Sequence, residues 1–319
     1  GGEMQERHRW TSPLIFEHCL APMAQRRNRQ SAFGRLAAAL LGVGLMGWSL
    51  PAEALVPYVY LPSEEELKGS SLGIGRTAAQ LLQLGQPREA AQLAALAVRL
   101  QPDDERLWSV LAEAQLRSEQ LDAASVSLAK AKSLNPDKAG LWFAEAAIAL
   151  RSDRPDEAIS LLNRGLQLDS GNSAAYFDLG NARIMQEELK MALQAFEKAT
   201  ALKPDFWEAL NNQALVLYQL GNREEAIRRW RKVLSIEDNP EPMLALAAAL
   251  YRQDRNREEA LRLAKTSLAK EPNYVLAPHQ EEQLWGTKIR AAAAQLMADE
   301  ELADTVERAR ANATWKKRS

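Results

Sequence analysis

Amphipathic stretches of the chain end at similar short sequences, each with a proline or a turn-forming residue at its end. Residues 202–211, LKPDFWEALN, are an example. Pro204 cannot continue a helix that begins upstream, and Asp205 can cap the amphipathic run that follows it. The pattern therefore predicts that one helix ends and another begins at this point.

This break recurs at a fixed interval of 34 residues. The positions that share it hold proline or a residue that favours turns and caps: Pro102, Pro136, Ser170, Pro204, Asp238 and Pro272. A constant period without insertion indicates an array of structural repeats. Six units are predicted to cover residues 71–274, with the bounds 71–104, 105–138, 139–172, 173–206, 207–240 and 241–274.

Within a unit, the order of large and small residues resembles the tetratricopeptide repeat family. In residues 173–206 the matching positions hold Tyr176, Leu179, Gly180, Ala192, Phe196, Ala199 and Pro204. Two helices pack closely only where one contributes small residues, so we expect Gly180 and Ala192 to face each other. The resemblance implies an all-α fold, a right-handed α-solenoid of six helix pairs with a C-terminal capping helix region.

The repeat pattern stops after Pro272. A terminal repeat leaves an apolar face open, so residues 275–313 are predicted to form a helical cap. Trp285, Ile289 and Leu296 have the spacing to cover that face. Residues 314–319 are expected to be a tail. Residues 55–70, which include two prolines, are expected to form an extended lead-in to the first repeat.

The N-terminal part of the chain has the composition of an export signal. Three arginines within residues 26–29 precede an apolar stretch at residues 36–50, and the small-residue motif AEA follows at residues 52–54. The apolar stretch is shorter than the roughly 20 residues that span a bilayer. We therefore interpret residues 23–54 as a signal peptide that is cleaved after Ala54.

The alternative is an uncleaved membrane anchor formed by residues 36–50, through which the protein would associate with a membrane. Residues 1–22 are interpreted as read-through upstream of a start at Met23. Either interpretation places the protein outside the cytoplasm, in a periplasm or in a thylakoid lumen or membrane.

Cleavage would leave few of the side chains that usually serve in catalysis. Removing residues 1–54 removes Cys19, the single cysteine, together with His8 and His18, and leaves His279 as the remaining histidine. Thiol nucleophiles, disulfides and multi-histidine metal sites are thereby excluded. Glycine motifs for phosphates or dinucleotides are also missing from the sequence. We therefore predict no enzymatic activity, no cofactor and no metal.

The charge of the chain gives no reason to expect a nucleic-acid partner. The formal net charge is -2, from 40 basic and 42 acidic residues. The locally basic sequence RRWRK at residues 228–232 is interpreted as the solvated face of a helix.

The family resemblance implies a concave groove lined by positions two, five, nine, twelve and thirteen of each first helix. The predicted partner-binding residues of this groove are Phe143, Phe177, Asn181, Met185, Asn212, Leu215 and Tyr218. For the apolar members, packing between helices is the alternative. Family members that clamp acidic chaperone tails use cations where this chain has Phe177, Pro242 and Leu246, so such a clamp is not expected.

These features predict a non-catalytic scaffold or assembly factor that binds a protein or peptide partner in the groove. Exported repeat proteins of this build resemble those that help to assemble photosynthetic membrane complexes in cyanobacteria and chloroplasts. The alternative function is a docking subunit of an envelope enzyme or secretion system.

Overall fold

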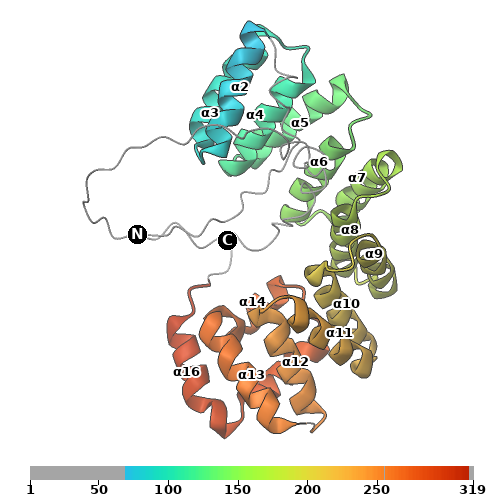
Figure 1. Ribbon diagram of the computed structural model, residues 1–319, viewed down its shortest axis with the longest axis vertical. Helices are drawn as coiled ribbons and strands as arrows, with labels where there is room; N and C mark the ends of the chain where they lie inside the picture. Colours follow the sequence, from blue (N-terminus) through green and yellow to red (C-terminus); the bar gives the residue numbers. More distant parts are fainter. Residues whose placement is uncertain (1–68, 255, 316–319) are drawn as a thin grey trace, which may run out of the picture. The chain divides into compact units, whose positions relative to one another are not determined.

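A computed structural model describes residues 69–254 and 256–315, and every regular element within them is a helix (Figure 1). The predicted all-α fold class is confirmed. The export signal, the alternative anchor, the upstream read-through and nearly all of the lead-in lie outside the described residues. No helix in the described part of the chain is long and apolar enough to cross a bilayer.

Six helix pairs follow one another along the chain. They are α2 (Ser70–Gln83) with α3 (Pro87–Leu100), α4 (Glu105–Arg117) with α5 (Leu121–Leu134), α6 (Ala139–Arg151) with α7 (Pro155–Leu168), α8 (Ser173–Met185) with α9 (Leu189–Leu202), α10 (Trp207–Leu220) with α11 (Arg223–Ile236), and α12 (Pro240–Arg252) with α13 (Arg257–Lys270). The chain divides into two compact units between Ala144 and Glu145, within α6. We describe each unit separately.

Every turn between the two helices of a pair contains a residue with positive φ: Gly85, Glu119, Asp153, Glu187, Gly221 and Asp254. This left-handed conformation reverses the chain within a few residues, and it strains side chains that carry a Cβ. Glycine avoids that strain at two of these turns, whereas acidic residues occupy the other four. The tight reversal allows the helices of each pair to pack against each other.

In the N-terminal unit, one interaction recurs in successive repeats. The indole of Trp108 donates from Nε1 to the carbonyl oxygen of Pro102 at 2.8 Å, and Trp142 donates in the same way to Pro136 at 2.8 Å. The aromatic residue near the start of a first helix thus bonds to the break that ends the preceding repeat. This contact fixes each first helix to the turn before it.

The helices of the fourth pair pack closely at Gly180. A Cβ placed on Gly180 of α8 would lie 2.4 Å from Cε1 of Phe196 on α9. Gly180 therefore lies directly against the Phe196 ring.

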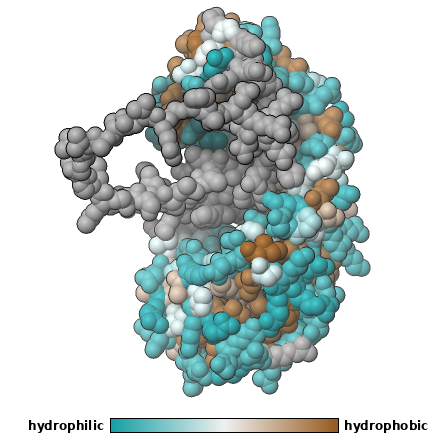
Figure 2. Space-filling view, viewed as in Figure 1, coloured by the Kyte–Doolittle hydropathy of each residue, from teal (hydrophilic) through white to brown (hydrophobic). Residues whose placement is uncertain are grey.

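The C-terminal unit ends in a segment of shorter helices that packs on the last repeats. It comprises η1 (Pro272–Val275), α14 (Ala277–Glu282), α15 (Thr287–Met297), η2 (Glu300–Leu302) and α16 (Ala303–Asn312). Helix α15 packs on α12 and reaches α10, whereas α16 packs on α13 and η1. Figure 2 shows mainly hydrophilic residues on the visible face of this unit, with apolar residues between them.

The side chains expected to cover the last repeat lie in the core of the C-terminal unit. Ile289 and Leu296 are fully buried and Trp285 is 2% exposed, in one hydrophobic cluster with residues of α10–α13. The C-terminal segment is therefore part of the folded core.

Candidate functional site

A ladder of side-chain amides connects α8 with α10. Asn212 donates from Nδ2 to Oδ1 of Asn181 at 2.8 Å, and Asn211 donates from Nδ2 to Oδ1 of Asn212 at 3.3 Å. The indole of Trp230 donates to Oδ1 of Asn211 at 3.0 Å. The ladder orients the amides of Asn181 and Asn212, the two residues that the sequence suggested for holding a peptide backbone.

Asn181 keeps hydrogen-bonding capacity after these contacts are made. Its Oδ1 accepts from Asn212, whereas its Nδ2 donates to no group among the described residues. Met185 lies four residues later on α8, hence on the same face of the helix, and it is half-buried. Asn212 is also half-buried. We refer to Asn181, Met185 and Asn212 as the candidate binding surface.

The predicted aromatic members of the site contribute to packing. Phe177 is 8% exposed, and its ring centroid lies 5.7 Å from that of Phe196 and 5.1 Å from that of Phe206. Phe143 belongs to the N-terminal unit, where its side chain is fully buried. Both residues therefore correspond to the packing alternative that the sequence left open.

Leu215 and Tyr218 on α10 are each 2% exposed. They belong to the same hydrophobic cluster as Trp285, Ile289 and Leu296, whose backbone lies in or just before α15. The tyrosine ring also packs on Trp230, with centroids 5.9 Å apart. These two predicted groove residues thus share a core with the C-terminal segment, whose helix α15 contacts α10.

Polar contacts fix the start of α15 to the end of α10. Gln219 donates from Nε2 to Oγ1 of Thr287 at 3.0 Å, and its Oε1 accepts from the backbone N–H of Lys288 at 3.0 Å. A Cβ on Gly286 would lie 2.5 Å from Oε1 of Gln219, so the glycine permits the close approach. These contacts hold α15 over α10 and α12.

A buried carboxyl group, that of Glu241 on α12, accepts a hydrogen bond from the C-terminal segment. Trp285 donates from Nε1 to Oε1 of Glu241 at 3.1 Å. Burial raises the pKa of Glu241, and hydrogen bonds from Trp285, Asn211 and Tyr274 oppose that rise. The Tyr274 hydroxyl is buried beside this carboxyl, and its pKa is raised, first by burial and then by the charge of Glu241.

The described residues offer no cluster of histidine, cysteine, aspartate and glutamate that could hold a metal ion. His279 is 7% exposed, and its ring lies edge-on to Tyr274 with centroids 4.9 Å apart. The basic residues in the middle of α11 pair with acidic neighbours: Arg228 and Arg229 pair with Glu225, and Arg231 pairs with Glu259.

A repeat model from one known family matches the chain. Residues 149–208 match the tetratricopeptide repeat, and these residues span α7, α8 and α9 with the turns that flank them. This stretch of the chain is therefore similar to a tetratricopeptide repeat (TPR).

Solved TPR structures share the fold. PilF of Pseudomonas aeruginosa is 18% identical, with a TM-score of 0.58 over 67% of this chain and 96% of that one. PilW, described as a widely conserved type IV pilus biogenesis factor, is 19% identical, with a TM-score of 0.55 over 69% and 97%. Residues from 41 onward of MamA from Desulfovibrio magneticus RS-1 are 18% identical, with a TM-score of 0.51 over 53% and 96%. No curated protein sequence matches the chain.

One polar residue at a TPR groove position was missed in the sequence. Asn211 is the fifth residue of its unit, one of the positions said to line the groove, and it joins the ladder to Trp230. Its position in the repeat could have identified it. The sequence could not show that the Asn211 amide would form hydrogen bonds with Trp230 and Asn212.

Proposed function

We propose that this protein is a non-catalytic scaffold that binds a protein or peptide partner at Asn181, Met185 and Asn212. The observation that carries the proposal is the oriented amide of Asn181, whose Nδ2 has no acceptor among the described residues. A peptide carbonyl can accept from that group, and the thioether of Met185 offers an adaptable apolar contact on the same helix face.

The C-terminal segment limits where such a partner binds. Helix α15 contacts α10, on which Leu215 and Tyr218 are each 2% exposed. The partner therefore contacts α8 and the start of α10, where the candidate binding surface lies. A short peptide segment fits this restricted surface better than a long helix that would need the whole row of first helices.

Affinity purification from the source cells tests the proposal with a matched pair of variants. Met185→Glu places a charge in the candidate binding surface, whereas Met191→Glu places it on α9, where Met191 is 46% exposed. A specific partner is expected to co-purify with the wild type and the Met191 variant but not with the Met185 variant. Retention of the same proteins by both variants would contradict the proposed surface.

We also propose that the protein acts outside the cytoplasm as an assembly factor for a membrane complex. The support is the signal-like sequence of residues 23–54. N-terminal sequencing of protein from its source is expected to read Leu55-Val56-Pro57. A mature protein that begins at Met23 or Ala24 and remains with the membranes would instead favour an anchor at residues 36–50.

A further inference from the structure

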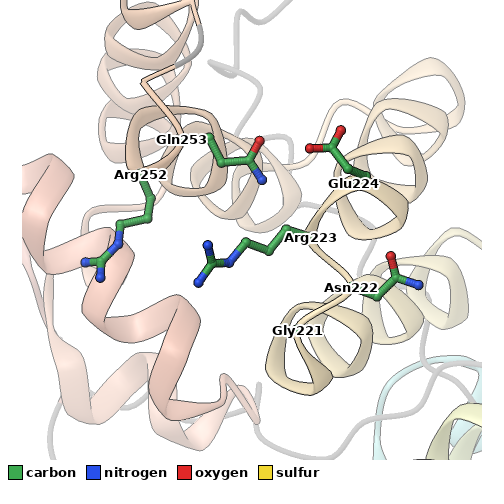
Figure 3. A pocket seen from close by; sticks show the side chains of 6 residues that line it. All are labelled: Gly221, Asn222, Arg223, Glu224, Arg252 and Gln253. Atoms are coloured by element: carbon green, nitrogen blue, oxygen red, sulfur yellow. The ribbon is translucent and has the colours of Figure 1, made fainter.

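A second site lies outside the candidate binding surface, between the fifth and sixth helix pairs. It is an open pocket of about 440 Å³ at the turn that joins α10 to α11 and at the end of α12. Its lining residues are Gly221, Asn222, Arg223, Glu224, Arg252 and Gln253 (Figure 3). The volume falls within the roughly 300–1,000 Å³ that is common for ligand pockets.

The local fold brings two arginines to this pocket. Gly221 adopts φ 95° at the end of α10, and its N–H bonds to the carbonyl oxygens of Leu217 and Tyr218. The resulting reversal places Arg223 at the first residue of α11, beside Arg252 at the last residue of α12. Figure 3 shows the two guanidinium groups on the same side of the pocket, away from the Glu224 carboxylate.

The positive charges of the two arginines are only partly compensated. Arg252 donates from Nη1 to the uncharged amide oxygen of Gln295 at 2.7 Å, which leaves its other N–H groups for a ligand. The Arg223 side chain has neither a hydrogen bond nor an ion pair with any described residue. Two like charges that share a pocket repel each other, and a bound anion relieves that repulsion.

A third cation lies near the pocket and adds to the attraction for an anion. The Lys288 ammonium group donates to the carbonyl oxygen of Gln219 at 2.7 Å and lies 4.0 Å from where a Cβ on Gly221 would be.

Gln253 adds a hydrogen-bond acceptor to the residues of the pocket. Its Oε1 is buried without a hydrogen-bond partner among the described residues, and an unsatisfied buried acceptor destabilises the structure that contains it. A rotation of the side-chain amide would turn this oxygen towards the pocket, where a ligand N–H can satisfy it. The backbone of a peptide supplies such an N–H.

We propose that this pocket binds an acidic segment of a partner protein, with a carboxylate between Arg223 and Arg252 and a backbone N–H on Gln253. Arginine is suited to this role because its planar guanidinium group matches the two oxygens of a carboxylate. The site uses none of the residues of the candidate binding surface, so the two proposals can fail independently.

Fluorescence anisotropy with a fluorescein-labelled tetraglutamate peptide tests the assignment on the full chain. Arg223→Gln and Arg252→Gln are each expected to weaken binding about tenfold or more, because each removes charge-assisted hydrogen bonds. Arg262→Gln is the matched control, since Arg262 is an exposed arginine on α13, and its affinity should stay within about twofold of the wild type. Circular dichroism verifies that each variant is folded.

Three results would overturn the proposal. Wild-type affinity in both pocket variants would place the peptide elsewhere. An equal loss in the Arg262 variant would reveal unspecific attraction to surface charge. Displacement of the peptide by an equal concentration of inorganic phosphate would assign the pocket to small anions.

Discussion

The close approach of Gly180 to Phe196 can be tested by adding a single methyl group at Gly180. A methyl group at Gly180 would overlap the phenylalanine ring, whereas a Cβ on Gly73 of α2 would meet no atom within 4 Å. Gly180→Ala should therefore lower the free energy of unfolding by about 1–3 kcal/mol. Gly73→Ala should raise it by about 0.5–1 kcal/mol, because alanine favours a helix over glycine. Urea denaturation followed by circular dichroism measures both, and effects of the same sign would refute the close packing.

Glu241 predicts a specific pH dependence. Its pKa in the folded protein is raised above the ordinary 4.5, chiefly by burial, so the folded state binds this proton more tightly than the unfolded state does. The stability that comes from the protonated group is complete below about pH 4.5 and is lost as the pH rises through the folded pKa.

Glu241→Gln tests this dependence because the amide oxygen can still accept from Trp285. Relative to the wild type, the variant should gain stability as the pH rises above 4.5. Thermal unfolding at a series of pH values provides the measurement. A constant difference between the two proteins across the series would mean that the carboxyl titrates normally in the folded state.

At the level of single elements, α15 is expected to stabilise α12. Trp285→Ala empties a large buried volume and should cost about 3–5 kcal/mol, with Trp285→Phe as the control that keeps most of the packing but loses the bond to Glu241. Contacts in a repeat array run between neighbours, so hydrogen exchange should rise first in α12 and α13 and stay unchanged in α2–α5. An equal increase in hydrogen exchange in all helix pairs would contradict this local dependence.

The elements also show what sequence patterns can and cannot predict. The prolines and turn residues at intervals of 34 predict helix pairs because a proline ends a helix through its own backbone, which is a local effect. The turns within the pairs were harder to predict from the sequence. Glycine indicates the left-handed conformation in two of them, whereas Glu or Asp adopts it in the other four. The contact between Gln219 and Thr287 joins residues 68 positions apart, and no local pattern encodes it.

At the scale of the whole molecule, the first helices of the repeats carry the predicted groove residues, and some of these residues are half-buried while others are buried. The sequence identified Asn181 and Asn212 as candidates from their repeat positions, and the structure links them by a hydrogen bond of 2.8 Å. The same reasoning selected Leu215 and Tyr218, which are buried in a cluster that includes residues of the segment beyond the repeats. Repeat position alone therefore describes packing reliably but overestimates the accessible site.

Site-specific photo-crosslinking in the source cells tests the central claim most directly. A benzophenone amino acid at position 185 samples the candidate binding surface, and the same group at position 191 samples the exposed side of α9. The account predicts that position 185 captures a defined partner peptide, identified by mass spectrometry, and that position 191 does not. Capture of that peptide from position 191 alone, or equally from both positions, would show that the partner binds elsewhere on the protein.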